Sequence, residues 1–255
     1  MARTDRDWTI WGENDPYFGV LSTPKFRASQ IASTKPEFMA EGEAYVDRHL
    51  AEIEAYLGKV GCKKALDFGC GVGRLAIPLA RRFESVVGLD VSVGMLRESE
   101  RNAAEAGLTN TTFYVSDDSL SNAPDKFDFV HTYIVLQHIP VSRGMKIIQE
   151  LLERVEFDGI VSLHVNLERR TPFHLQAVYW ARTRVPFANG LFNLLRGRPI
   201  AEPCMQMNEY SLRDVLEATA VAGFGTAVVR FENHGMCRTV QIFARRRADL
   251  GPTSR

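Results

Sequence analysis

Hydrophobic residues along this chain follow two different spacings. In some stretches they recur every three or four positions, which predicts amphipathic helices, and in others they form short runs bounded by turn residues, which predicts buried strands. Because helices separate the strands between residues 64 and 167, we expect parallel pairing through right-handed crossovers. The expected strands lie at 65–68, 86–90, 111–115, around 129–130 and at 160–167, and the expected helices lie at 75–83, at 93–106 and after Ser142.

The C-terminal part of the sequence predicts a helix followed by a hairpin. The helix begins at Ser211 and ends before Gly223, and strands at 226–231 and 238–244 flank the tight-turn sequence Glu232-Asn-His-Gly235. The fold class predicted for the chain is therefore α/β, with a doubly wound, mostly parallel seven-stranded sheet that ends in an antiparallel hairpin.

Two segments break the alternation and are expected to lie over the sheet. Residues 1–33 are aromatic and irregular, which predicts a strap or a lid, and a capping box places a helix from Thr34 to Gly58. Residues 168–210 form an insertion after the fifth strand that carries many hydrophobic residues and six arginines. We expect it to cap a binding site, with a solvated face or an oligomer contact as the alternative. The expected division of the chain is 1–58, 59–167, 168–210, 211–247 and a frayed tail at 248–255.

Three glycines follow the first strand of the alternating region. Gly69 comes two residues after Asp67, Gly71 and Gly73 follow at alternate positions, and a helical pattern begins immediately after them. Glycine accepts a positive φ, and without a Cβ it lets a ligand lie against the backbone. The next strand ends on Asp90, an acid that can accept hydrogen bonds from both hydroxyls of a ribose. The unit is therefore expected to bind a ligand that contains a nucleoside, and the neighbouring residues Cys70 and Val91 are expected to contact it.

The D-x-G-x-G-x-G pattern resembles motif I of the class I S-adenosylmethionine-dependent methyltransferases. It differs from a dinucleotide fingerprint, because Arg74 stands where that pattern has its third glycine. The resemblance extends over about residues 40–245 and implies S-adenosylmethionine as cofactor and S-adenosylhomocysteine as product. It also implies site roles: Asp67 near the amino group of the ligand, Asp90 at the ribose, and Asp117 (with Asp118 as competitor) at the adenine. If residues 1–33 form a lid, Tyr17 or Phe18 is expected near the sulfonium, because a positive sulfur is attracted to an aromatic face.

Residues 125–140 resemble motif IV of the same family and the loop that follows it. The resemblance implies that Tyr133 and His138 lie where cofactor and acceptor meet. His138 is the first candidate for a base, since histidine suits proton transfer near neutral pH, and His164 is the second. No metal is expected, because His131 or Thr132 occupies the position that carries an acid in metal-dependent catechol-type relatives.

The composition of the chain limits the classes of acceptor molecule and the cellular location that we expect. The chain has 255 residues with 31 basic and 31 acidic side chains, so it offers no overall field for nucleic acid or an anionic membrane, although a local patch can still exist. Neither a signal peptide nor a membrane-spanning run is evident, and the four cysteines form no C-x-x-C pair, which favours a cytoplasmic protein.

The predicted function is methyl transfer to a small-molecule acceptor, at a hydroxyl of a sugar, a phenol or a biosynthetic intermediate. The alternatives are an RNA or protein acceptor, for which the balanced charge gives no support, and a cofactor-binding module without catalysis. A dehydrogenase is the least favoured interpretation. A homo-oligomer is compatible with the sequence, and a membrane protein is not expected.

Overall fold

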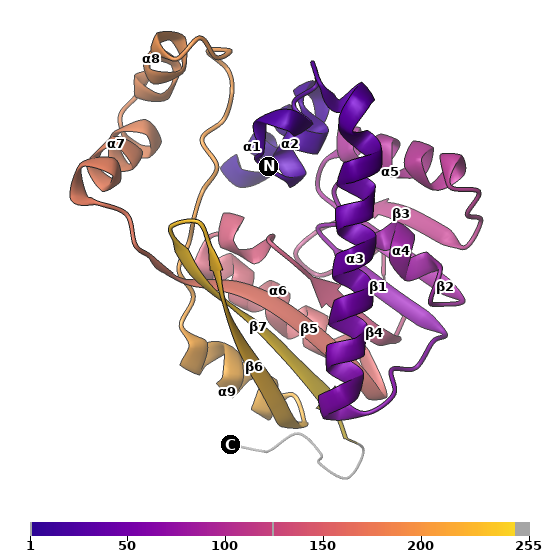
Figure 1. The fold of residues 1–255 in the computed structure, drawn as a ribbon. Helices are drawn as coiled ribbons and strands as arrows, with labels where there is room; N and C mark the ends of the chain where they lie inside the picture. The colour runs from indigo at the N-terminus through magenta and orange to yellow at the C-terminus, as the bar shows by residue number, and fades with distance from the viewer. Residues whose placement is uncertain (1, 124, 248–255) are drawn as a thin grey trace.

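A seven-stranded sheet forms the centre of the molecule in a computed structural model that describes residues 2–123 and 125–247 (Figure 1). The strand order is β3-β2-β1-β4-β5-β7-β6. Neighbouring strands are parallel from β3 to β5, whereas β7 runs antiparallel to both β5 and β6. This arrangement confirms the expected fold class. The strands are β1 Lys64–Phe68, β2 Ser85–Asp90, β3 Thr111–Val115, β4 Phe127–Thr132, β5 Val155–Arg169, β6 Phe224–His234 and β7 Cys237–Arg246.

Helices cover both faces of the sheet and enclose a separate core on each (Figure 1). One face carries α3 Ile31–Leu57, α4 Ala76–Ala80 and α5 Val93–Glu105, and the other carries α6 Val141–Glu153 and α9 Leu212–Val221. Two predicted helix starts are confirmed by their caps. The Ser92 and Ser211 hydroxyls accept hydrogen bonds from the N–H groups of Met95 and Asp214, which fixes the first turns of α5 and α9.

The N-terminal segment is helical, so the prediction of an irregular strap at 1–33 is wrong. It forms α1 Arg3–Asn14, α2 Pro16–Val20 and a 3₁₀ turn, η1 Pro24–Phe26. Part of the contact between α1 and the start of α5 is made by glycine, beside the packing of Trp11 on Met95. A Cβ added to Gly12 would lie 2.0 Å from the Ser92 hydroxyl. Behind α1 and α2, the aromatic residues of the segment build a third core, which contains Trp11, Tyr17, Phe18, Phe26 and Phe38.

The start of α3 also differs from the prediction. The helix begins at Ile31, and the Thr34 hydroxyl donates to the carbonyls of Lys25 (2.7 Å) and Gln30 (3.2 Å) instead of capping a new turn. Pro36 lies inside the helix beyond its first turn, so the hydrogen bond that an N–H there would make to the Ala32 carbonyl is absent. The capping-box sequence was therefore a poor guide here, since contacts with the 3₁₀ turn decide where the helix begins.

The expected insertion leaves the sheet after β5. It forms two helices, α7 Phe173–Arg184 and α8 Ala188–Leu195, which Figure 1 shows standing away from the sheet. The chain then returns in an extended conformation, and the Tyr210 N–H donates to the Asn166 carbonyl on β5. Among the described residues, no helix combines the length and the apolar character needed to cross a membrane. The expected tail at 248–255 lies outside the described residues.

Candidate active site

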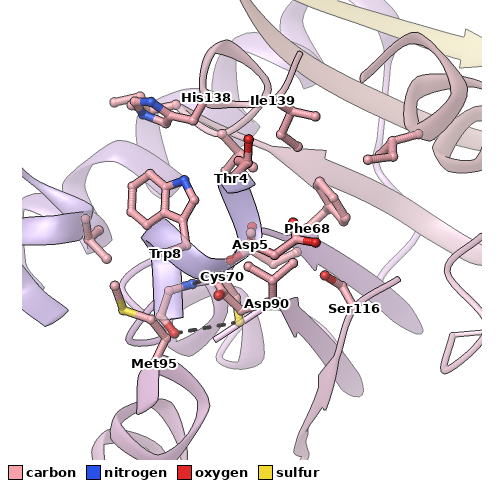
Figure 2. Close-up of a pocket in the computed structure, with 18 of the residues that line it drawn as sticks. Thr4, Asp5, Trp8, Phe68, Cys70, Asp90, Met95, Ser116, His138 and Ile139 are labelled. Carbon is pink, nitrogen blue, oxygen red and sulfur yellow. Dashed lines mark hydrogen bonds between the residues drawn. The ribbon is translucent and has the colours of Figure 1, made fainter. Parts of the chain in front are cut away.

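A cavity opens at the edge of the sheet where β1, β2, β3 and β4 end, and helix α1 covers one side of it (Figure 2). The ends of parallel strands in an open α/β sheet are the usual place for a ligand. The structure brings most of the sequence-predicted site residues together there. Those that line the cavity are Asp67, Gly69, Cys70, Gly71, Asp90, Val91, Asp117, Asp118, Tyr133 and His138.

The glycine turn keeps the floor of this cavity free of side chains. Gly69 and Gly71 have φ values of +74° and +55°, which residues with a Cβ rarely adopt. A Cβ on Gly69 would lie 2.3 Å from a methyl of Val135. Gly73, the third predicted glycine, also has a positive φ but does not line the cavity. It serves the local backbone rather than direct contact with a ligand.

Asp90 lies at the end of β2 with its carboxylate held in place by the backbone. Its two oxygens accept from the N–H groups of Gly71 (3.0 Å) and Ser92 (2.9 Å). Burial raises the pKa of Asp90 to about 6, although these two hydrogen bonds oppose the shift. A carboxylate has about four lone-pair sites, so each oxygen can still accept one hydroxyl of a ribose.

Asp67 and Arg74 present unpaired polar atoms of opposite charge to the same cavity. One Asp67 oxygen accepts from Nδ1 of His131 at 3.0 Å, while the other is buried with no hydrogen-bond partner among the described residues. Arg74 is only 6% exposed, and its Nε likewise has no partner in the described part of the chain. Unpaired buried groups in native proteins call for an explanation. An α-amino acid moiety, with one ammonium and one carboxylate, would satisfy both.

Arg74 is a functional candidate that sequence reasoning missed. It was considered only as the residue that breaks a dinucleotide fingerprint. The signal that could have found it is a charged residue directly after a ligand-binding glycine turn, on a segment whose other positions are apolar. Nearly all of its neighbours from 75 to 80 are buried hydrophobic side chains.

Asp117 and Asp118 both reach the cavity but are already engaged by other groups. Asp117 accepts from the backbone N–H groups of Ser119 (3.1 Å) and Ser121 (3.0 Å) and from both hydroxyls. The Ser121 hydroxyl is the main cause that lowers the pKa of Asp117. Asp118 instead forms an ion pair with Arg143 at 2.6 Å. An adenine amino group would therefore share Asp117 with the loop that follows it.

Helix α1 forms the cover that the sequence placed in this segment, but with different residues. Trp8 lines the cavity, and its ring faces His138 at 5.0 Å between ring centroids (Figure 2). Tyr17 does not line the cavity, since its hydroxyl is bonded to Asn102 (3.0 Å) and its ring packs against Phe38. Phe18 does not line it either. Among the aromatic residues of α1 and α2, the cavity lining thus includes Trp8, while α2 contributes Gly19 and Val20.

An ion-pair cluster fastens α1 to the rim. Asp5 of α1 bonds to the guanidinium of Arg143, which also bonds Asp118 on the opposite side. All three residues line the cavity. Partners on two sides hold the pKa of Arg143 well above its ordinary value, with the Asp118 hydrogen bond as the largest cause.

His138 lies at the acceptor side of the cavity as a neutral imidazole. Its Nδ1 donates to the Gln206 carbonyl at 2.7 Å, which leaves Nε2 as an acceptor, 3.3 Å from the side-chain nitrogen of Gln137. Burial lowers the pKa of His138 to about 4. The side chain is therefore uncharged at neutral pH and can accept a hydrogen bond through Nε2.

A match to a family model coincides with this geometry. The model described as "Methyltransferase domain" matches residues 65–159, which contain the glycine turn, Asp67, Asp90 and His138. Residues 65–159 therefore match a methyltransferase domain, and the sheet has the fold of methyltransferases solved with S-adenosylmethionine.

Curated relatives match over part of the chain. A ubiquinone biosynthesis O-methyltransferase from Methylococcus capsulatus is 35% identical over 89 residues, which are 34% of this chain and 37% of the relative. A 23S rRNA uracil methyltransferase from Aeromonas salmonicida is 37% identical over 86 residues, 32% of this chain and 20% of the relative. The chain thus spans well under half the length of these curated relatives.

Solved structures resemble the methyltransferase over more of its length. Magnesium protoporphyrin IX methyltransferase from Synechocystis, solved with bound S-adenosylmethionine, has a TM-score of 0.62 and 19% identity, and the match covers 96% of this chain and 98% of that one. The N-terminal domain of EvdMO1, solved with S-adenosylhomocysteine and D-fucose, has a TM-score of 0.52 and 20% identity, covering 79% and 82%. At these identities the likeness shows the fold.

Near the cavity the methyltransferase also gathers a polar cluster that no sequence spacing indicated. His164 of β5 does not line the cavity, but its ring lies against Tyr133, with 4.7 Å between centroids. Its Nε2 is 4.0 Å from the Glu232 carboxylate, which also bonds His234 at 2.8 Å. The Tyr133 hydroxyl lies 3.4 Å from the same His234 nitrogen. Residues on three strand segments thus meet beside the acceptor side of the cavity.

The protonation of this cluster follows from its hydrogen bonds. The Ile134 N–H donates to Nδ1 of His164 at 3.3 Å, so the proton of the neutral ring is on Nε2. Burial lowers the pKa of His164 to about 3. Burial alone would raise the pKa of Glu232, but hydrogen bonds from His234 and Arg230 lower it to about 2. His164, Glu232 and His234 each offer one possible metal-ligand atom, and these three atoms lie within 4.8 Å of one another. A metal ion would have to bind His164 through Nε2, which carries the proton of the neutral ring.

Proposed function

We propose that this protein transfers the methyl group of S-adenosylmethionine to a hydroxyl of a small-molecule acceptor. The observation that carries the proposal is the pair of unpaired buried atoms, Asp67 Oδ2 and Arg74 Nε, in a cavity that also contains Asp90. Together these groups match the ammonium, the carboxylate and the ribose of one ligand. A dinucleotide has no amino acid end to satisfy the first two.

Each side chain then has a defined task in holding the cofactor. Asp67 accepts from the ammonium, Arg74 donates to the carboxylate, and Asp90 accepts from the ribose hydroxyls. The Trp8 ring supplies an aromatic face for a positive sulfur, an attraction that increases when water is excluded. The cofactor supplies a methyl group on a sulfonium whose departure as a thioether requires no acid. The protein contributes mainly alignment, which is worth about 7–11 kcal/mol in well-oriented reactions.

His138 is the residue that we propose as the base. Its fixed tautomer leaves the lone pair on Nε2, which accepts from the Gln137 side chain at 3.3 Å, so an acceptor hydroxyl would replace Gln137 as the donor to Nε2. The lowered pKa makes it a weak base in the empty cavity, and a bound carboxylate or an alkoxide developing nearby would raise that pKa. Tyr133 is proposed to face the acceptor from the cavity wall, whereas His164, which does not line the cavity, is proposed to position the Tyr133 ring together with the Glu232–His234 pair.

Because helix α1 covers the cavity, a small-molecule acceptor fits the site better than a polymeric acceptor does. Helix α1 spans the cavity and is bonded to its rim through Arg143, which leaves little room for a nucleic acid strand. The balanced charge of the chain gives no general attraction for RNA. The likeness to a domain solved with D-fucose makes sugars the first acceptors to test. A cytoplasmic location and a homo-oligomeric state stay predictions.

The decisive experiment separates cofactor binding from acceptor choice. Calorimetric titration with S-adenosylhomocysteine tests the cradle, and the Asp15→Ala variant, which changes a buried acid outside the cavity, is the matched control for Asp90→Ala. Incubation with labelled cofactor and either a metabolite extract or total RNA then identifies by mass which fraction gains a methyl group. Absence of product binding would refute the proposal. Label found only in RNA would refute the acceptor class and keep the methyltransferase.

A further inference from the structure

The insertion carries an excess of positive charge that the rest of the chain balances. The insertion, residues 168–210, contains six arginines, three glutamates and no lysine or aspartate, and Arg170 and Arg198 pair with Glu168 and Glu202. Two of the other guanidinium groups have no charged partner in the described part of the chain. Arg184 has no ion pair or hydrogen bond among the described residues, and Arg196 contacts only the Phe192 ring, at 4.7 Å. The helices α7 and α8 therefore present a local cationic surface.

The same insertion also exposes large hydrophobic side chains. It holds ten of the nineteen large hydrophobic residues that are exposed in the described part of the chain. Helix α7 buries none of its residues. The ten exposed hydrophobic residues are Phe173, Leu175, Val178, Trp180, Val185, Phe187, Leu191, Leu194, Leu195 and Ile200.

Helix α8 arranges three of these side chains on one face. Leu191, Leu194 and Leu195 follow the i, i+3, i+4 spacing of a helix stripe, and Phe187 precedes them at the N-cap. Phe187 is 92% exposed and adopts a φ of +62°, a conformation that is strained for a bulky residue. A strained backbone that projects an aromatic ring into solvent is explained when the ring has a partner outside the chain.

We propose that the surface formed by α7 and α8 docks onto an anionic lipid bilayer and lies in its interface. Leucine and aromatic side chains enter the boundary between headgroups and acyl chains, while arginines bind the lipid phosphates. Both features occur together on this insertion. Figure 1 shows α7 and α8 projecting beyond the sheet, so a flat surface can reach them without contact with the remaining helices.

Charge and side-chain type distinguish this occupant from two others. A second copy of the chain would bring six further arginines against the first six, and like charges across an interface are unfavourable. A nucleic acid would satisfy the arginines but not the aliphatic stripe, because bases stack on aromatic rings and guanidinium planes. A bilayer with acidic headgroups satisfies both the charge and the stripe.

Vesicle sedimentation without cofactor tests the proposal independently of the proposed methyl transfer. The full chain should bind vesicles of phosphatidylcholine that contain phosphatidylglycerol and should not bind phosphatidylcholine alone, and salt at about 0.5 M should weaken the binding. Emission from Trp180, which is 60% exposed, should shift to shorter wavelength on binding. Trp180→Phe should lose that shift, because Trp11 is buried and Trp8 lies against His138.

Double variants test whether α7 and α8 carry the membrane-binding surface. Arg184→Glu/Arg196→Glu should reduce partitioning by about fivefold or more per arginine, and Leu191→Ser/Leu194→Ser should reduce it without changing the salt dependence. Arg213→Glu and Tyr56→Ser are controls on exposed residues elsewhere and should have no effect. An unchanged unfolding temperature shows that each variant folds.

Three results would overturn the proposal. The first is no binding to either vesicle or equal binding to both. The second is loss of binding in the control variants to the same extent as in the insertion variants. The third is that the protein does not bind vesicles but binds RNA tightly, or instead forms a dimer that Leu191→Ser/Leu194→Ser dissociates. Either result would assign the surface to that partner.

Discussion

Replacing Arg74 by methionine separates the energetic cost of a buried charge from its use in binding. The guanidinium is 6% exposed, and its Nε has no partner among the described residues. An unpaired buried ion costs several kcal/mol even after relaxation, whereas methionine of similar length fills the same space without charge. We therefore expect Arg74→Met to raise the free energy of unfolding of the ligand-free protein by about 1–3 kcal/mol.

The same substitution should weaken binding of S-adenosylhomocysteine. A hydrogen bond to a charged group contributes about 1.5–3 kcal/mol, so loss of the carboxylate partner predicts a dissociation constant about 10–100-fold higher. Methylthioadenosine has the adenosine and the thioether but no amino acid end, and its affinity should not change. Urea denaturation measures the first effect, and calorimetric titration with both ligands measures the second.

A matched control is available on the same segment of the chain. Arg82 is exposed and pairs with Asp47 at the surface, so Arg82→Met should alter neither ligand affinity. Equal weakening of both ligands by Arg74→Met would place the guanidinium away from the amino acid end. A lower free energy of unfolding would show that Arg74 has stabilising contacts, and the explanation given for its burial would then be wrong.

Three other predictions test the remaining parts of the cavity. Asp90→Ala should weaken S-adenosylhomocysteine binding by about 100-fold or more, since two charge-assisted hydrogen bonds are lost. In the wild type, affinity should fall as the pH decreases through about 6, because protonation of Asp90 competes with the ribose, and calorimetry on the variant should show no such fall. Gly69→Ala should lower the free energy of unfolding by about 1–3 kcal/mol, and Val135→Ala should restore part of it if the 2.3 Å contact is responsible. His138→Ala should slow turnover by about 10²–10⁴-fold with cofactor affinity unchanged, and normal turnover would exclude it as the base.

The cofactor side of the site could be predicted from the sequence because its parts are local. The strand, the glycine turn and the start of the next helix occupy one continuous stretch, and Asp90 lies at the end of the following strand. Glycine spacing and an acid at a strand end are properties of short segments. Sheet topology then places Asp67 and Asp90 together, because β1 and β2 are parallel neighbours.

Errors arose where tertiary contacts decide the outcome. The helix α1 was not predicted, because the glycines and prolines of residues 1–33 indicated irregular structure, and Trp8 was therefore not chosen as the aromatic cover. Gly12 in fact lets α1 approach the start of α5 closely. The capping box at Thr34 was overridden by contacts with the 3₁₀ turn. In each case the local pattern was weak or misleading, and the partner residues are distant in sequence.

The acceptor side is assembled almost entirely from such distant contacts. Helix α1 is bonded to the rim through Asp5 and Arg143, 138 positions apart, and to the insertion through Arg3, which donates to the Thr183 carbonyl 180 positions away. Glu232 meets His164 only because β6 and β5 both pair with β7. A methyltransferase keeps one cofactor, and a compact sequence motif can specify its cradle. The rest of the cavity is instead closed by α1 and α2, which lie outside that motif, so its chemistry follows from how these N-terminal helices meet the loops after β3 and β4.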